Sequence, residues 1–331
     1  MKPIIKLNRR HALGWGLGAF ASMPWTTQAQ GVTSTFPRGP LKVIMPFGAG
    51  GAADAVMRPV ALELEKALKQ PVLLEHKPGG LFTIGMQAIS SAPADGHTLI
   101  FLSNSLASVQ ATQGKFDLTR DLIPIGQMSS IAMVLLVPGN SPFKSVADLV
   151  KFAKANPKKL NYGTLGPGSV EHLKTLQLEK ISGISAQQVP YKAGTDAVKA
   201  LVGGEIDLLF TAASFGMAFA PKGQVKVLGV LGTNRLSIFP DVPTMTEAGL
   251  DIPPVSYWSG LGVHPDTPQP IVQRLHAEIT AASQKDSVRE RLSGMAAEPV
   301  VSKSPADFRQ VIAEEIAWMA NVSKGLNLGS S

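Results

Sequence analysis

Residues 41–68 read LKVIMPFGAGGAADAVMRPVALELEKAL, which is a short apolar run, a glycine-rich turn and a stretch with apolar residues at helical spacing. A strand, a tight turn and a helix in this order form the repeating unit of α/β proteins with parallel strands. Glycines let the backbone of the turn approach a ligand closely, and the helix that follows presents unpaired N–H groups with partial positive charge. The segment therefore predicts an anion site at the end of a buried strand.

A second glycine-rich turn, residues 162–169 with the sequence YGTLGPGS, also lies between a short apolar run and a helical stretch. One such turn is weak evidence for a ligand. Two of them, in different halves of the chain, suggest that one anion is held from both sides. We expect residues 48–52 to supply backbone N–H groups from the first turn and residues 166–169 to supply them from the second.

The first 29 residues have the features of an export signal. Lys2, Lys6, Arg9 and Arg10 precede an apolar run at 12–23, and small residues follow, so we predict cleavage after Ala29. The apolar run is too short to span a membrane as a helix. The paired arginines favour a twin-arginine signal, with a general secretory signal as the alternative. Either route predicts a periplasmic protein.

The rest of the chain alternates short apolar runs with amphipathic stretches, which predicts an α/β fold with mixed, mostly parallel sheets flanked by helices. The residues after Ala29 exceed what one core usually organises, so we predict two lobes with the chain crossing between them more than once. The predicted strands are 41–45, 72–75, 98–102, 131–137, 160–164, 188–190, 206–211, 225–231 and 256–263. The predicted helices are 52–69, 82–92, one after strand 131–137 that Ser145 or Asp148 could cap, 169–180, 194–202, 268–283 and 305–322.

Composition excludes several classes of function. The chain has no cysteine, which excludes disulfides, thiol catalysis and cysteine-bound zinc. The leader holds four of the 31 basic residues and none of the 24 acidic ones, which leaves 27 basic residues and a mildly basic mature chain. No cluster of lysines and arginines with interleaved aromatics indicates nucleic-acid binding. The histidines show no metal-ligand spacing, and Ser169 with His172 is typical of a helix cap rather than a catalytic pair, so we predict no catalytic residue, metal or cofactor.

An exported NAD(P)-dependent oxidoreductase is the competing interpretation of the first turn. Gly48-x-Gly50-x-x-Ala53 follows a strand and opens a helix, and Glu75 ends the next strand, where a ribose-binding acid would lie. Against this interpretation, Asp54 stands in the first turn of the helix, where its charge would repel a pyrophosphate. The second glycine turn also has no role in a nicotinamide site.

Short motifs follow one another in order along nearly the whole mature chain. They are PFGAGGAAD at 46–54, EHKPG at 75–79, DGHTL at 95–99, NYGTLGPGSVEHL at 161–173, VPYK at 189–192, GGEID at 203–207, FPDVPT at 239–244 and WSGL at 258–261. This ordered set resembles the Bug-type receptors, the extracytoplasmic solute-binding proteins of tripartite tricarboxylate transporters.

The resemblance implies a two-lobed periplasmic binding protein, similar to type II Venus flytraps, that closes on a small carboxylate. It implies a signal peptide at 1–29, a first part of lobe one at 30–128, lobe two at 129–231, and a return to lobe one with the C-terminal helices at 232–331. The implied ligand-binding residues come from the two turns and from three loop tips: Phe47, Gly48, Ala49, Gly50, Gly51, Ala52, Asp54, Ser103, Thr164, Gly166, Gly168, Ser169, His172, Tyr191, Lys192 and Thr211.

The chain also departs from the family pattern. Ala49 stands where proline is usual, Leu81 and Phe82 replace small residues, and the glycine expected near Lys192 is shifted by one position. Because the loop tips vary, the identity of the carboxylate stays open. The resemblance implies a monomer that engages the two membrane subunits of a tripartite transporter, with a membrane sensor as the alternative partner.

Overall fold

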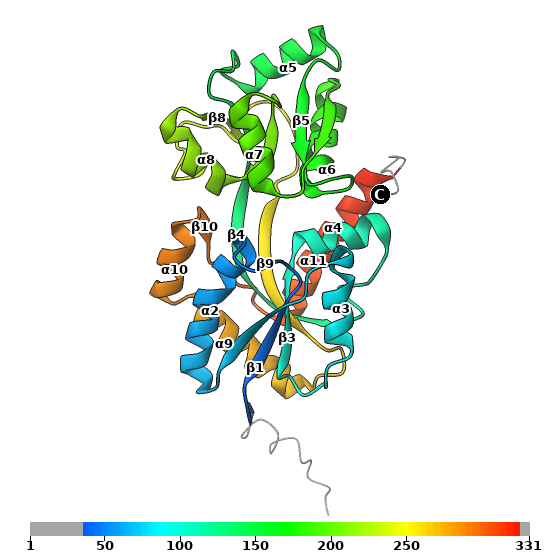
Figure 1. The fold of residues 1–331 in the computed structure, drawn as a ribbon, viewed down its shortest axis with the longest axis vertical. Coiled ribbons are helices and arrows are strands. Elements are labelled where there is room, and N and C mark those ends of the chain that lie inside the picture. The colour runs from blue at the N-terminus through cyan, green and yellow to red at the C-terminus, as the bar shows by residue number, and fades with distance from the viewer. Residues whose placement is uncertain (1–35, 325–331) are drawn as a thin grey trace, which may run out of the picture.

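The computed structural model describes residues 36–324, which form two lobes, one above the other in Figure 1. The sheet of the first lobe has the strand order β10-β4-β9-β3-β1-β2. Its strands are β1 (Leu41–Met45), β2 (Val72–His76), β3 (Thr98–Ser103), β9 (Ser256–Val263), β10 (Ala297–Glu298) and part of β4 (Ile123–Pro138). Its helices are α2 (Ala52–Leu68), α3 (Thr83–Ser90), α4 (Asn104–Gln113), α9 (Gln269–Ser283), α10 (Asp286–Ser293) and α11 (Pro305–Ser323), with a 3₁₀ turn η1 (Gly80–Phe82).

Strand β1 shows why this sheet is covered on both faces. Val43 and Met45 point into one core, with residues of α2, α9 and α10, whereas Ile44 points into another, with residues of α3, α4 and α11. Successive side chains of a strand alternate between the faces of the sheet. The apolar residues 43–45 of β1 are therefore buried on both faces of the sheet, which agrees with the predicted sheet flanked by helices.

The second lobe is smaller and is built on the other half of β4. β7 (Leu209–Ala212) and β8 (Val225–Val230) pair with β4, and β5 (Asn161–Thr164) pairs with β6 (Gln187–Pro190). A bridge between Tyr162 and Leu208 joins the two sets of strands. The helices of this lobe are α5 (Val146–Ala155), α6 (Val170–Ser182), α7 (Gly194–Gly203) and α8 (Ala213–Phe219), followed by a 3₁₀ turn η2 (Ala220–Lys222).

Two strands connect the lobes. β4 pairs with β9 up to Ala132 and with β7 and β8 from Met133 onward, so one strand belongs to both sheets. The chain returns through β9 (Figure 1). The predicted second lobe ends at 231, whereas hydrogen bonds join Val230 to Pro243 and Met245 to Val230, so this segment stays against β8 until β9 begins.

The sheets are mixed, as predicted, but antiparallel pairing is more extensive than the sequence suggested. β1 is parallel to β2 and β3, and β5 is parallel to β6. β4, by contrast, is antiparallel to β7, β8, β9 and β10. The reason is that the chain leaves the first lobe along β4 and comes back along β9, so these neighbouring strands run in opposite directions.

The sequence did not predict α4, α8, α10 or the first half of β4. Asn104–Gln113 has no apolar stripe, because residues on several sides of α4 are buried between the sheet and its neighbours. α8 is only seven residues long. A helix buried all round or shorter than two turns leaves no 3.6-residue pattern to detect.

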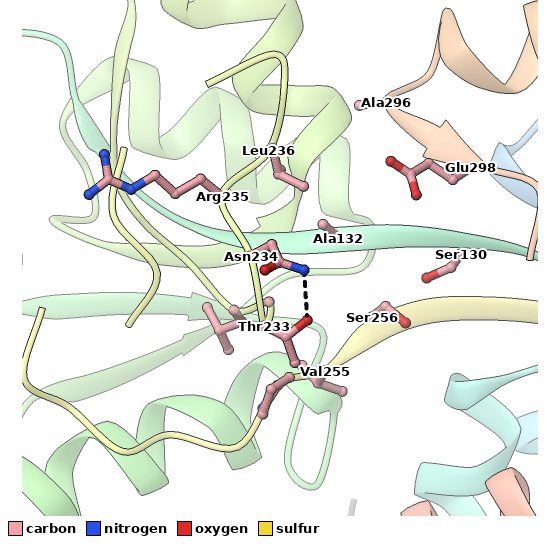
Figure 2. Close-up of a pocket in the computed structure, with 13 residues that line it drawn as sticks. Ser130, Ala132, Thr233, Asn234, Arg235, Leu236, Val255, Ser256, Ala296 and Glu298 are labelled. Atoms are coloured by element: carbon pink, nitrogen blue, oxygen red, sulfur yellow. Dashed lines mark hydrogen bonds between the residues drawn. The ribbon is translucent and has the colours of Figure 1, made fainter. Parts of the chain in front are cut away.

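A cavity of about 410 Å³ lies beside the connecting strands (Figure 2). Its walls come from β4, from the loop that follows β8, from the start of β9 and from β10, so both lobes contribute. The lining residues that Figure 2 labels are Ser130, Ala132, Thr233, Asn234, Arg235, Leu236, Val255, Ser256, Ala296 and Glu298. A rotation of one lobe against the other would change the shape of this cavity.

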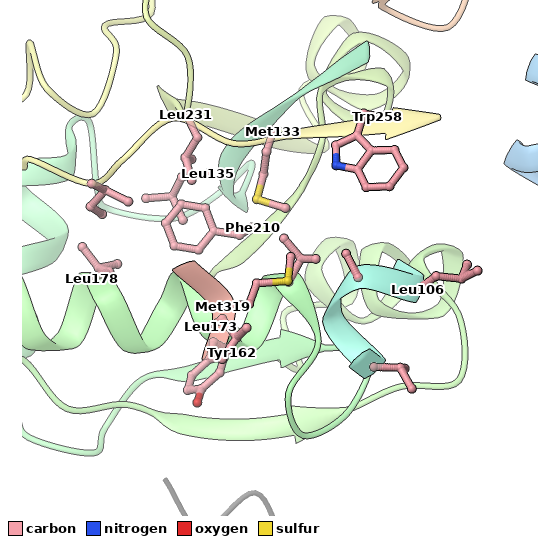
Figure 3. Close-up of a cluster of buried hydrophobic side chains, with 14 of the residues drawn as sticks. Leu106, Met133, Leu135, Tyr162, Leu173, Leu178, Phe210, Leu231, Trp258 and Met319 are labelled. Carbon is pink, nitrogen blue, oxygen red and sulfur yellow. The ribbon is translucent and has the colours of Figure 1, made fainter. Parts of the chain in front are cut away.

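Helix α11 packs against both lobes. Phe308 lies edge-on to Trp258 of β9, with ring centroids 5.4 Å apart, and fills the space above Gly260. Near the other end, Met319 belongs to the core that includes Leu173 of α6 and Phe210 of β7 (Figure 3). The helix therefore ties the second lobe to the first on one side of the connecting strands.

A buried lysine strengthens this attachment. The ammonium of Lys174 on α6 lies 3.8 Å from the centre of the Trp318 ring and donates to the carbonyl of Pro253 at 2.9 Å. Burial lowers the pKa of Lys174 to about 7, partly offset by the negative charge of Glu315. Burial likewise raises the pKa of Glu315 to about 7, against the hydrogen bond from the indole of Trp258 and the charge of Lys174. For each group burial disfavours the charged form, and the polar partners offset only part of this cost.

We expect Phe308→Ala to lower the free energy of unfolding by about 3–5 kcal/mol, because it empties a fully buried aromatic site. Val311→Ala, on the exposed side of the same helix, is the matched control and should change it by no more than about 0.5 kcal/mol. Urea unfolding followed by tryptophan fluorescence measures both values. Equal effects of the two substitutions would mean that α11 does not depend on this contact.

Candidate anion-binding site

The first glycine turn connects β1 to α2 and leaves backbone donors free. Gly50 has φ +80°, which favours glycine, and Gly51 is the N-cap residue of α2. Gly51 has no side chain to accept a hydrogen bond from the helix. Within residues 36–324, the N–H groups of Ala52 and Ala53 in the first turn of α2 have no hydrogen-bond partner. A bound anion would accept hydrogen bonds from these two N–H groups.

Asp54 holds this turn in place from beneath. Its carboxylate accepts the N–H of Gly50 at 2.9 Å, a guanidinium N–H of Arg58 at 2.9 Å and a contact at 2.7 Å with the Nε2 of His76. Burial alone would raise the pKa of Asp54, but the hydrogen bonds from Gly50, His76 and Arg58 outweigh it and lower the pKa to about 2. The buried carboxylate is therefore charged, and both of its oxygens already have hydrogen-bond partners. The guanidinium of Arg58 balances its charge.

The sequence predicted that Asp54 binds the ligand, whereas its contacts in the structure are with residues of the first lobe. Both carboxylate oxygens are taken by neighbours in the first lobe, so Asp54 positions the turn rather than offering an atom to a ligand. Arg58 stands one helical turn after Asp54, a spacing that the sequence displays and that favours an ion pair. His76 comes from β2, so only the tertiary structure brings it here.

Strands β1, β2 and β3 are parallel, so their carboxyl ends meet at the edge of the sheet that bears the first turn. Phe47 precedes the turn and packs on Phe82 and Phe101, with ring centroids 5.2 and 5.9 Å away. Ser103 ends β3, and its hydroxyl oxygen is buried without a hydrogen-bond partner among the described residues. The structure thus brings Phe47, Ser103 and residues 48–54 to one edge, as a shared site requires.

The second turn satisfies most of its own donors. The N–H of Gly166 donates to the hydroxyl of Thr164 at 3.1 Å, and that of Gly168 donates to the Nδ1 of His172 at 3.0 Å. The N–H of Ser169 donates to the carbonyl of Gly166, while its hydroxyl caps α6 by accepting from the His172 amide. Burial lowers the pKa of His172, which suits a neutral ring that accepts a hydrogen bond. This turn therefore has fewer free donors than the sequence suggested.

Two N–H groups at the second turn and the helix start that follows it remain without a partner in the described chain, those of Leu165 and Val170. Val170 begins α6, so its N–H carries the partial positive charge of a helix start. The free N–H donors that the sequence predicted at residues 166–169 are therefore found at the two flanking residues instead.

The second turn touches the first lobe directly. The hydroxyl of Ser108 on α4 donates to the carbonyl of Gly168. Gly168 has φ +79°, and a Cβ there would lie only 3.0–3.2 Å from atoms of Thr112. α4 begins where β3 ends, so the second turn lies against an element that starts at the edge of the first turn. The sequence missed Ser108 and Thr112, because it did not predict their helix.

The other predicted residues separate into two groups. Tyr191 and Lys192 follow β6, beside the second turn, since the Tyr191 N–H donates to the Thr164 carbonyl at 2.8 Å. Lys192 is exposed. Thr211, in contrast, is buried in β7 opposite Val134, so it belongs to the core of the second lobe. None of the predicted residues lines the cavity beside the connecting strands, whose walls come from separate segments without a common motif.

Glu75, the acid of the nicotinamide interpretation, has other partners. It forms ion pairs with Lys77 at 2.8 Å and with Lys42 at 3.0 Å, and the hydrogen bonds from Lys77 and Lys42 lower its pKa.

No group of three or more potential metal ligands exists in residues 36–324. No helix in that range is long and apolar enough to cross a bilayer.

The fold has the two-lobed architecture of solute-binding receptors. The model of the tripartite tricarboxylate transporter family receptor matches residues 56–328, and the chain belongs to this family, which consists of periplasmic binding proteins and not of enzymes. This membership overturns the oxidoreductase alternative and confirms the resemblance seen in the sequence.

Three solved structures are similar over nearly their full lengths. MatC of Rhodopseudomonas palustris, with bound malate, is 29% identical with a TM-score of 0.75, over 87% of this chain and 99% of that one. Rpa4515 of R. palustris, with adipate, is 27% identical with a TM-score of 0.78, over 87% and 97%. The periplasmic binding protein BugD is 25% identical with a TM-score of 0.75, over 89% and 100%.

We expect Asp54→Asn to lower the free energy of unfolding by about 2 kcal/mol at pH 7, since the folded pKa of about 2 lies below the ordinary 3.8. A lowered pKa stabilises the fold above pH 3.8, and this contribution is lost as the pH falls through 2. The difference between wild type and variant should therefore shrink between pH 4 and pH 2. A constant difference across urea melts at pH 7, 4 and 3 would show that the charge of Asp54 is not what stabilises the turn.

Proposed function

We propose that the protein captures a small carboxylate between its lobes, with the ligand's carboxylate at the N-terminus of α2. The observation that carries this proposal is the pair of free N–H groups of Ala52 and Ala53, on a turn that Asp54 holds rigid and Arg58 keeps electrically balanced. The relatives that hold malate and adipate support a carboxylate as the ligand class.

The second lobe would complete the site when the lobes approach each other. The N–H groups of Leu165 and Val170, with the exposed ammonium of Lys192, are the donors available on that side. Closure around the ligand would form the surface that the membrane subunits of a tripartite transporter bind. A membrane sensor is the alternative partner, and we propose that the receptor acts as a monomer.

We also propose that residues 1–29, which lie outside the described part of the chain, are an export signal. The basic start, the short apolar run and the small residues before Gln30 support cleavage after Ala29.

Gly51→Asp tests the anion site without disturbing the fold. A side chain here has open space, with only the Gly48 carbonyl at 3.7 Å, and aspartate is a better N-cap residue than glycine. We expect stability to stay the same or to rise slightly. The new carboxylate would occupy the free donors, so carboxylate affinity should fall at least ~100-fold, or about 2.7 kcal/mol. Malate and adipate are the first probes, measured by thermal shift and calorimetry.

The matched control is Gly39→Asp, which adds the same charge before β1, at the opposite end of that strand, with no atom within 4 Å of the new Cβ. It should leave binding unchanged. Gly168→Asp is a poor test because the positive φ and the contact with Thr112 would disturb the fold itself. Normal carboxylate binding by folded Gly51→Asp protein would place the ligand elsewhere.

Intact-mass analysis of protein from the periplasm should find a chain that begins at Gln30. Replacing Arg9 and Arg10 by lysine should block export through the twin-arginine route, because that route reads the arginine pair. Continued export of the variant would identify the general secretory route. Soluble periplasmic protein that retains residues 1–29 would contradict the proposed signal peptide.

A further inference from the structure

Two exposed leucines lie beside the glycine turns, one in each lobe. Leu81 follows β2 in the first lobe and is 43% exposed, and Leu165 follows β5 in the second lobe and is 44% exposed. Each comes after the carboxyl end of a strand that has a parallel neighbour, which is the edge where the glycine turns lie. An exposed large apolar side chain is ordinary by itself. One such leucine beside each of two turns that we propose to share a ligand suggests a common role.

The loop that carries Leu81 is held in an unusual conformation. Gly79, Gly80, Leu81 and Phe82 have φ values of +115°, +57°, +52° and +71°, so four successive residues lie in the left-handed region. Leucine and phenylalanine are disfavoured there, because their Cβ atoms crowd the following carbonyl. Strain of this kind persists where the surroundings hold it, and it gathers at ligand sites.

Aromatic packing fixes this loop beside the first glycine turn. The ring of Phe82 packs on Phe47, the residue before Gly48, and Phe47 packs in turn on Phe101 of β3. Leu81 directly precedes Phe82, so the contact that anchors Phe82 also keeps Leu81 next to the proposed carboxylate position. The side chain of Leu81 is therefore exposed to solvent on a backbone that the packing of Phe82 holds in place.

Charged groups on the same edge of the first lobe are already paired. Arg58 binds Asp54, which also contacts His76, and Lys77 binds Glu75. A second carboxylate on the ligand would find no unpaired cation among these residues. On the second lobe the exposed Lys192 is available to it. The first lobe therefore offers donors for one carboxylate and apolar surface for what is attached to it.

We propose that Leu81 and Leu165 form the two walls of the site that hold the rest of the ligand, so that the preferred ligand is a monocarboxylate with an apolar alkyl or aromatic body. The inference rests on the proposed carboxylate-binding function and names its substrate class. Closure would bring Leu165 toward Leu81 and remove the apolar body of the ligand from water.

Hexanoate and adipate are the probes that separate this class from dicarboxylates, because they have the same six-carbon chain and differ in one end group. Calorimetry on the mature protein should show hexanoate binding at least ~10-fold more tightly than adipate. Leu81→Ser and Leu165→Ser should each weaken hexanoate binding at least ~10-fold and thereby remove most of its preference over adipate. Leu73→Ser, an exposed leucine near the start of β2, is the control and should alter neither.

Two results would overturn the inference, and they differ from each other. Adipate binding more tightly than hexanoate, lost in Lys192→Met and unaffected by the leucine variants, would leave the proposed function intact and make the ligand a dicarboxylate. Binding of neither acid, nor of any other small carboxylate, would remove the proposed function and the inference with it. Melting temperatures of the ligand-free variants verify that each protein is folded.

Discussion

The pairing of β4 is the constraint on which the arrangement of the molecule depends. Its first half completes the sheet of the first lobe against β9, and its second half is the partner of β7 and β8 in the second lobe. Because backbone hydrogen bonds on both halves are made by one continuous strand, neither lobe can move without bending β4 and β9. A rotation of one lobe against the other would therefore bend these two strands.

The packing between the two lobes differs on the two sides of these connecting strands. On one side, α11 packs on β4, β9 and α6, and the buried ammonium of Lys174 contacts Trp318 and the Pro253 carbonyl. Ser108 adds a contact from α4 to the second turn. On the β10 side, the structure has a cavity of about 410 Å³ instead of packed side chains. A rotation with its axis on the α11 side would preserve the contacts made there and would change mainly the cavity on the β10 side.

The two glycine turns resemble each other in sequence but differ in what they offer a ligand. In the first, the buried carboxylate of Asp54 takes the inward N–H of Gly50, which leaves the helix-start donors facing outward. In the second, Thr164, His172 and Gly166 accept the donors of the turn itself, and the carbonyl of Gly168 is used to contact the other lobe. The first turn thus leaves donors free, whereas the second uses most of its polar groups for its own fold and for the junction between the lobes.

The sequence by itself determined the local units: the strand, turn and helix around Gly48–Ala53, the same device before α6, most strand positions, and the family. These depend on apolar periodicity, glycine and the order of motifs, all of which are local. Only the tertiary structure decided which N–H groups are free, because Asp54 is braced by His76 from another strand and Gly168 meets Ser108 from a helix without a periodic pattern. It also decided that β4 serves two sheets and that Thr211 is core rather than site. Local residue spacing does not reveal hydrogen-bond partners that are distant in the chain. A glycine-rich turn therefore indicates an anion site, but the residues packed around the turn determine which N–H donors remain free to bind the anion.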